Sequence, residues 1–434
     1  MSGAGLRFAA TDSTPAVTRG DVSHTRGDIR AAADVLRDAL AESGITRFLV
    51  HSDDSALILH AILAADDLGG DLYIAHTSLT AEQIEALSEE QGVQAVITAP
   101  GEWRRRGGVT GKIPSGRIFM MTSGTTGMPK IASHSLDSLI SKAQSGQRRR
   151  PEGGGRWLLT YQPTGFAGLQ VTLTAALWEG LLITPAERTM SQFYQAARQW
   201  QATHISATPT FWRSFLMIAN PKELDLHQIT LGGEAADQAT LDRVAKAFST
   251  ARMTHTYAST EAGMVYAVHD GREGFPAAWL TEPPSGVQLR LVDGFLQIKT
   301  PNMMRGYVSN QAQPLLDDGW LSTADLAVVE GDRVKVLGRD DNTINVAGSK
   351  VYPLPIEALI LKRPCVIEVR VYGVPNPVSG ALVAADVVLE PGTEQKAAKK
   401  DILSACREAL PGYSVPRVMN FVEKIAVSAS SKKG

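Results

Sequence analysis

Apolar and polar positions along the first hundred residues follow two alternating spacings. From Asp28 to Ser43 apolar residues recur at helical spacing, which predicts a helix, and residues 45–51 then form a short apolar run typical of a strand. The same pattern predicts helices over 55–67 and 80–91 and strands over 72–75 and 95–97. Helices that alternate with strands in this way indicate an α/β fold.

This alternation continues through the middle of the chain and then changes. Strands are predicted at 157–161, 229–231 and 254–257, among helices that end at Leu177, Gln201, Ile218 and Phe248. Further on, short strands with turns between them predict an antiparallel, barrel-like portion at 287–292, 295–299 and 334–337. Beyond Gly338 a smaller unit begins, with strands predicted over 366–373, 382–389 and 418–422 and a helix over 394–409.

The chain has 434 residues, of which 44% are hydrophobic, and this is enough for two or three domains with large cores. The predicted fold class is α/β. A large N-terminal domain over 1–338 combines α/β subdomains with the small barrel-like part, and a small mobile α+β domain follows over 339–434. Turn-forming residues at 338–342 separate the two, so we expect a hinge near Asp341.

Charge and cysteine content limit the classes of partner. The 43 basic and 45 acidic residues leave a net charge of −2, which gives no global field for nucleic acid or an anionic membrane. The basic runs at 104–106 and 148–150 are expected to be solvated loops. Two cysteines exclude a cysteine-rich metal cluster and are typical of a reducing compartment. Residues 1–21 contain no apolar stretch long enough for a signal peptide or membrane span, so we expect a cytoplasmic protein.

A Gly/Ser/Thr loop that ends in a lysine is the main candidate for phosphate binding. It follows the apolar run 118–121 and contains Thr122, Ser123, Gly124, Thr125, Thr126, Gly127 and Lys130. Its glycines allow close approach of the backbone to a ligand, and its hydroxyls add donors beside the amides. Pro129 disfavours a helix before Lys130, so the expected arrangement is strand, loop, strand, unlike a Walker loop. The alternative for such a run is an ordinary hairpin turn.

Further polar groups stand at the ends of predicted strands. Tyr257, Ala258, Ser259, Thr260 and Glu261 follow one another at such an end. Glu261 could ligate Mg²⁺ and Thr260 could donate to a phosphate, whereas the alternative for a lone Thr-Glu pair is a helix N-cap. Asp325 could accept bonds from ribose hydroxyls, and taken alone it is a turn residue.

Taken in order, these segments resemble the superfamily of adenylate-forming enzymes, which includes acyl-CoA and aryl-CoA ligases, adenylation domains of nonribosomal peptide synthetases, and firefly luciferase. The resemblance extends from about Ile118 to the end of the chain. It implies a two-step reaction that uses ATP and Mg²⁺. A carboxylic acid attacks the α-phosphate, pyrophosphate leaves, and the acyl-adenylate is captured by the thiol of CoA or of a phosphopantetheine on an acyl carrier protein.

The resemblance also implies roles for single residues. Gly232, Gly233 and Glu234 would line the adenine pocket, with Tyr257 stacked on adenine. Ala258 and Ser259 would also contact the nucleotide, and Thr260 would meet the α-phosphate. Asp325 and Arg339 would hold the ribose, and Lys130 and a Mg²⁺ on Glu261 would neutralise phosphate charge. Gly348 matches the loop that lines the pantetheine tunnel.

Lys432 matches the lysine that enters the site from the small domain during adenylation. Its alternative is a frayed basic tail, because Ser431 replaces the family's glycine and the chain stops two residues later. Ala258 and Ala324 also replace glycines of the family pattern. The N-terminal part is shorter than usual, so one subdomain is expected to be trimmed and the outer substrate pocket to be more open.

The matching substrate pocket contains Tyr161, Phe166, Gly168, Gly233, Ala258 and Gly263. No carboxylate occurs between Trp157 and Trp178, where peptide-synthetase domains place an Asp against an α-ammonium group, so an α-amino acid is disfavoured. Ala258 leaves open a pocket that acetate-activating relatives fill with Trp. An aryl or medium-sized acid is therefore favoured. The alternatives are adenylation of a small inorganic acid such as nitrite, a nucleotide-binding member that has lost turnover, and luciferase-like oxidation.

Overall fold

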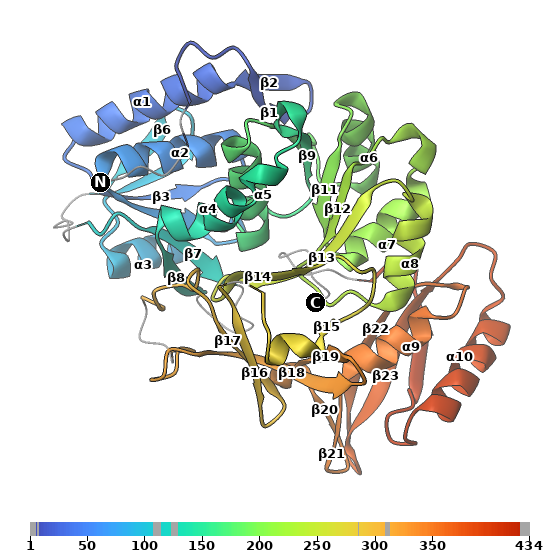
Figure 1. The fold of residues 1–434 in the computed structure, drawn as a ribbon. Helices are drawn as coiled ribbons and strands as arrows, with labels where there is room; N and C mark the ends of the chain where they lie inside the picture. The colour runs from blue at the N-terminus through green and yellow to red at the C-terminus, as the bar shows by residue number, and fades with distance from the viewer. Residues whose placement is uncertain are drawn as a thin grey trace.

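The computed structural model describes residues 6, 8–106, 114–122, 129–284, 286–308 and 313–425 (Figure 1). Two mainly parallel sheets form its main body. The eight-stranded sheet has the order β14-β13-β12-β11-β9-β10-β1-β2 and the six-stranded sheet the order β6-β5-β3-β4-β7-β8. The strands of the larger sheet are β1 (Pro15–Arg19), β2 (Val22–Thr25), β9 (Arg156–Leu159), β10 (Leu181–Thr184), β11 (His204–Ala207), β12 (Gln228–Leu231), β13 (Arg252–Ser259) and β14 (Gly263–Val268). Those of the smaller are β3 (Arg47–His51), β4 (Asp71–Ala75), β5 (Ala95–Ala99), β6 (Glu102–Arg105), β7 (Ile118–Thr122) and β8 (Lys130–His134).

Helices cover both sheets. They are α1 (Arg26–Glu42), α2 (Ser55–Leu68), α3 (Ala81–Gln91), α4 (Leu136–Ser145), α5 (Phe166–Leu177), α6 (Met190–Gln199), α7 (Pro209–Ile218) and α8 (Gln238–Ala247). Every residue of α2 from Ser55 to Ala65 is buried, because the helix is apolar all round and joins α1, α5 and strands of both sheets in one core cluster. This shared core fixes the two sheets relative to each other.

A five-stranded antiparallel sheet with the order β15-β19-β18-β17-β16 follows, drawn in yellow and orange at the lower edge of Figure 1. Its strands are β15 (Phe275–Pro276), β16 (Gln288–Val292), β17 (Phe295–Lys299), β18 (Leu321–Glu330) and β19 (Arg333–Arg339). After a short 3-10 turn, Asp340–Asn342, the chain enters a sheet with its own core. That last unit contains β20 (Ile344–Val346), β21 (Ser349–Val351), α9 (Pro353–Leu361), β22 (Val366–Asn376), β23 (Gly380–Leu389), α10 (Gln395–Ala409) and β24 (Val418–Phe421).

The α/β class, the barrel-like antiparallel part and the smaller C-terminal α+β unit are confirmed. Several elements escaped prediction, among them β1, β2 and α9. The hairpin β1–β2 is held by β10, more than 150 residues away, and α9 begins with two prolines, which a helix tolerates only in its first turn. The expectation of a loop at Arg104 was wrong, since this residue lies in the edge strand β6, where charged side chains discourage further pairing.

Candidate active site

Strands β7 and β8 form an antiparallel hairpin in which Thr122 lies opposite Lys130. The predicted strand, loop, strand arrangement is therefore confirmed. Lys130 is the first residue of β8, opposite the last residue of β7. We call this end of the two strands the mouth of the hairpin. The candidate phosphate-binding residues between them, Ser123, Gly124, Thr125, Thr126 and Gly127, lie outside the described residues, and their role stays a prediction.

Lys130 and Glu261 are brought to the same place by a tyrosine. The hydroxyl of Tyr307 donates to Oε1 of Glu261 over 2.7 Å, and its ring lies 5.3 Å from Nζ of Lys130. Burial and the adjacent Glu261 carboxylate raise the pKa of Tyr307, so the phenol keeps its proton and acts as the donor. The sequence analysis did not single out Tyr307. The sequence around Tyr307 carries no motif that indicates its role, and only the fold brings it to Glu261.

The backbone around Tyr307 is fixed on both sides. Met304 N–H donates to the carbonyl of Glu261 over 2.9 Å, and Val308 N–H donates to the carbonyl of Ile131 over 3.0 Å. Segment 304–308 thus joins the turn that carries Glu261 to strand β8, which carries Lys130.

Thr260 and Glu261 lie in the turn between β13 and β14. The expected alternative of a helix N-cap is wrong, since two antiparallel strands flank the turn. Gly263 ends the turn at φ +70°, and a Cβ there would lie 2.7 Å from the carbonyl oxygen of Asn302. The glycine is thus required by a close backbone approach. Its predicted place in the substrate pocket stays a prediction.

His134 hydrogen-bonds to the turn that carries Thr260 and Glu261. Its Nε2–H donates to the carbonyl of Thr260 over 2.8 Å, and burial lowers the pKa of His134, so the ring is neutral. Its other nitrogen, Nδ1, is buried and has no hydrogen-bond partner among the described residues. The ring centroid lies 6.1 Å from that of Phe166 at the start of α5. His134 is a second residue that the sequence analysis did not identify, because a histidine at the end of an apolar strand gives no specific signal.

Tyr257 and Asp325 are joined directly, because the Tyr257 hydroxyl donates to Oδ2 of Asp325. Burial, followed by the Asp325 charge, raises the pKa of Tyr257 well above its ordinary value. Asp325 lies opposite Arg339 in the β18–β19 pairing, so the two residues predicted to hold a ribose are neighbours. Ala324, which stands in place of a family glycine, has left-handed backbone at φ +59°.

The turn Gly232–Gly233–Glu234 follows β12 and packs against β9 and α7. The hydroxyl of Tyr161 donates to the carbonyl of Gly232 over 3.1 Å. Oε2 of Glu234 accepts from the amide of Thr210 over 3.1 Å and from its hydroxyl over 2.7 Å. Because Thr210 lies in the first turn of α7, the carboxylate also faces the positive end of that helix.

Tyr161, Phe166 and Ala258 belong to one apolar cluster, in which both aromatic rings are buried. All three therefore pack in the core that the two sheets share, and their place in a substrate pocket stays a prediction. Gly168 has a packing role, because a Cβ there would lie 2.0 Å from the carbonyl oxygen of Gln162.

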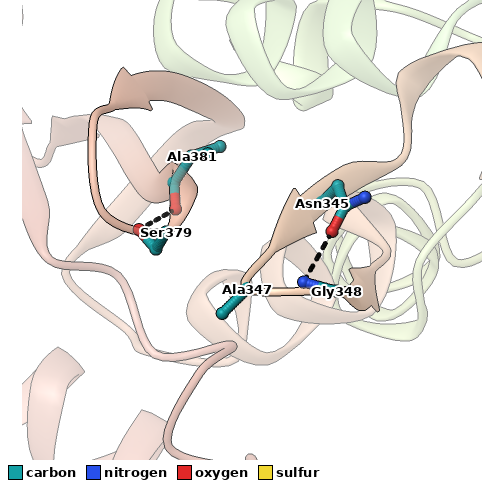
Figure 2. A pocket seen from close by; sticks show the side chains of 6 residues that line it. Asn345, Ala347, Gly348, Ser379 and Ala381 are labelled. Carbon is teal, nitrogen blue, oxygen red and sulfur yellow. Dashed lines mark hydrogen bonds between the residues drawn. The ribbon is translucent and has the colours of Figure 1, made fainter.

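Gly348 lies apart from these groups. It stands at the tip of the β20–β21 hairpin, at the lower edge of Figure 1 and away from β13. An open hollow of about 530 Å³ lies beside it. Figure 2 shows the residues that line this hollow, at the tip and at the turn that begins β23. Asn345 Oδ1 accepts from Gly348 N over 3.0 Å within the first turn, and Ala347 N donates to Ser379 O over 2.8 Å, which joins the two turns.

Ser259 and Arg339, two further predicted residues, each bond to a residue nearby in the sequence. Ser259 Oγ accepts from the amide of Ala262 over 3.0 Å and so closes the turn. Arg339 donates through Nε to Asp341 over 3.4 Å at the junction of the large and small units. Lys432 lies outside the described residues.

Within the described part of the chain, no group of three or more His, Cys, Asp or Glu side chains could hold a metal ion. Mg²⁺ commonly binds through one or two carboxylates, substrate phosphates and water, so Glu261 fits a metal that arrives with a nucleotide. None of the described helices combines the length and apolar character needed to cross a membrane.

Comparisons with known proteins find AMP-binding enzymes and CoA ligases. The family described as AMP-binding enzyme matches residues 115–308, and the AMP-binding enzyme C-terminal domain matches residues 355–432. The 2-succinylbenzoate–CoA ligase of Bacillus licheniformis is 24% identical over 333 residues, which are 72% of this chain and 68% of the relative. A probable 2-succinylbenzoate–CoA ligase of Mycobacterium tuberculosis is 30% identical over 290 residues, 63% of this chain and 71% of the relative.

Solved structures agree in fold. The o-succinylbenzoate CoA synthetase of Bacillus subtilis, in complex with an acyl-adenylate intermediate, matches with a TM-score of 0.75 at 20% identity, over 97% of this chain and 94% of that one. An anthranilate CoA ligase in complex with anthranoyl-AMP matches with a TM-score of 0.82 at 18% identity, over 97% and 93%. At these identities the likeness establishes the fold alone.

Proposed function

Since the chain belongs to the adenylate-forming superfamily of AMP-binding enzymes, and is thus an acid–thiol ligase, we propose that it activates an aryl or medium-sized carboxylic acid and passes it to CoA. The observation that carries the proposal is the convergence of Lys130, Tyr307 and Glu261 at the mouth of the β7–β8 hairpin. A cation, a hydrogen-bond donor and a carboxylate at one place are what a polyphosphate with its Mg²⁺ requires.

In this proposal Lys130 and the loop amides bind the phosphates. Glu261 would hold the Mg²⁺, and the ion would supply positive charge for the leaving pyrophosphate. Thr260 donates to the α-phosphate. Because Tyr307 donates to Oε1 of Glu261, the other carboxylate oxygen, Oε2, would be the one to bind the metal.

The nucleoside lies between two groups of residues. Asp325 and Arg339 hold the ribose, and Tyr257 together with Gly232, Gly233 and Glu234 forms the adenine pocket. Tyr257 and Asp325 already hydrogen-bond to each other, so this wall is ordered before the nucleotide binds.

The acid lies against the apolar cluster that contains Tyr161, Phe166 and Ala258. Aromatic side chains favour a planar, apolar acid, and relatives named for 2-succinylbenzoate and anthranilate support an aryl substrate. The same names support CoA as the acceptor in preference to a carrier protein.

Two orientations of the small domain complete the proposed cycle, with a hinge near Asp341. In the orientation observed here the β20–β21 hairpin, which carries Gly348, lies away from β13. We assign this orientation to adenylation, in which Lys432 would reach the developing phosphate charge. After rotation the hairpin that carries Gly348 lines the path of the pantetheine thiol. Lys432→Ala should slow adenylation by about 10² to 10³ and leave thiol capture intact, with Lys433→Ala as the control.

The experiment that tests the function is pyrophosphate release over a panel of aryl, acyl and inorganic acids with ATP and Mg²⁺. Mass spectrometry of the adenylate, and of the thioester after CoA is added, identifies the products, and Glu261→Gln is the inactive control. An aryl-adenylate that becomes an aryl-CoA supports the proposal. Release with nitrite alone, or nucleotide binding without any release, would overturn it.

A further inference from the structure

Arg213 on α7 makes a buried ion pair across the boundary between the two units. Its side chain is 3% exposed, and its terminal nitrogen lies 3.5 Å from Oε1 of Glu368 on β22, whose side chain is 8% exposed. Arg213 also donates to Thr240 over 3.1 Å and lies 3.3 Å from Asp237 at the start of α8. Arg213 therefore joins α7 to α8 and to β22.

The same guanidinium reaches the candidate adenine pocket through a single residue. Arg213 donates to the hydroxyl of Thr210 over 2.9 Å, and that hydroxyl donates to Glu234 over 2.7 Å. A continuous series of polar contacts thus runs from the turn at Gly232–Glu234 to β22 of the small domain. Arg243 on α8 makes a separate contact, since it donates to the carbonyl of Val366 over 2.9 Å.

A buried ion pair of this kind favours one orientation without locking it. The free energy needed to desolvate both charges offsets most of their attraction. Moving the small domain so that both groups return to water therefore costs little free energy. Removing one partner while the pair stays buried costs more, because the other charge is left without its counter-ion. Arg213 keeps Asp237 as a second counter-ion, which moderates that cost.

We propose that Arg213 is a positioning residue, which couples the Gly232–Glu234 turn to the orientation of the small domain through its ion pair with Glu368. The inference depends on the proposed function, since it assigns the observed orientation to adenylation. With the pair formed, the small domain is held against α7 while Arg213 holds Thr210, and Thr210 holds Glu234. By linkage, a nucleotide that orders the turn stabilises this orientation, and this orientation strengthens nucleotide binding by the same factor. Loss of the pair therefore weakens nucleotide binding.

The test is Glu368→Gln, which keeps the size of the side chain and removes its charge. Adenylation, measured as pyrophosphate release, should fall about tenfold, and thioester formation from a supplied acyl-adenylate should fall by less than twofold. Glu357→Gln is the matched control: Glu357 is also a buried carboxylate of the small domain, and it accepts from Val371 N within that domain. It should change the two half-reactions equally.

Orientation is measured directly with spin labels on non-natural residues at Gln195 in α6 and Lys399 in α10, both exposed. Mg²⁺ and ATP should narrow the distance distribution in the wild-type protein and do so less in Glu368→Gln. Arg213→Gln combined with Glu368→Gln should shift the distribution no further than either change alone.

These distance measurements need no acid substrate, so they test the coupling even where the proposed ligase activity fails. Equal losses in both half-reactions, an unchanged distance distribution in Glu368→Gln, or additive effects of the two changes would each overturn the inference.

Discussion

Tyr307→Phe removes one hydroxyl from the centre of the candidate site and keeps the ring beneath Lys130. In the wild-type protein that hydroxyl donates to Glu261 over 2.7 Å. A hydrogen bond to a charged group contributes about 1.5–3 kcal/mol, and the lower value applies because Glu261 is only partly buried and water can replace the phenol. About 1.5 kcal/mol corresponds to roughly a tenfold effect.

We expect Tyr307→Phe to raise the Mg²⁺ concentration needed for half-maximal pyrophosphate release by about tenfold, in the range typical of residues that orient a metal ligand. Tyr307→Leu also loses the contact of the ring with the Lys130 ammonium, which contributes about 0.5–1 kcal/mol and adds a further two- to fivefold loss in rate. Stabilisation of the protein by Mg²⁺ and ATP in a thermal melt gives a readout that is independent of turnover.

The matched control is Tyr372→Phe, because the Tyr372 hydroxyl also donates to a carboxylate, that of Asp386, over 3.0 Å in the small domain. It should leave the Mg²⁺ dependence unchanged. An unaltered Mg²⁺ requirement in Tyr307→Phe, or an equal loss in Tyr307→Phe and Tyr307→Leu, would refute the assignment of Tyr307.

Three further predictions concern the backbone and pH. Ala324→Gly should raise the free energy of unfolding in urea by about 0.5–1 kcal/mol. Left-handed backbone costs alanine about 1–2 kcal/mol, and the greater chain entropy of glycine in the unfolded state offsets part of that gain. A lower free energy of unfolding would contradict this prediction. Gly263→Ala should displace the turn from Asn302 O and reduce pyrophosphate release by more than about tenfold. Wild-type activity in this variant would show that the turn accommodates a Cβ without moving Glu261. Burial lowers the pKa values of His60 and His204 to about 4, so both rings stay neutral in the folded protein near neutral pH. The free energy of unfolding keeps its full value above about pH 6.5. It falls by roughly 3 kcal/mol for each residue as the pH drops towards 4, because the unfolded state then binds a proton that the folded state does not. Urea melts at pH 7 and 4.5 should show a smaller difference for His204→Gln, and an unchanged difference would exclude His204 as the cause.

The sequence predicted the architecture well where the pattern was local. Helices α2, α3 and α10 begin and end within a residue or two of the expected positions, because their apolar spacing and capping residues lie in the same short stretch. Strand β1 was not predicted, since its three buried residues are covered by a strand that comes much later in the chain.

The candidate site was predictable only in part for a related reason. Polar residues in recognisable motifs, such as Glu261 and Asp325, could be assigned from their order along the chain. Tyr307 and Arg213 act through contacts with residues 46 and 155 positions away, and their own neighbourhoods carry no motif. The clash that requires glycine at Gly168 likewise becomes visible only when α5 is packed on the preceding turn.

The joining of β8 to the turn at Glu261 has a consequence for how the protein acquires its activity during folding. The contact of His134 with Thr260 spans 126 positions, and that of Tyr257 with Asp325 spans 68. Contacts so distant in sequence form late, after each sheet has collected its local helices. Refolding should therefore restore helical circular dichroism well before the capacity to release pyrophosphate, and a chain still emerging from the ribosome stays inert until segment 304–308 has been synthesised and has paired with β8.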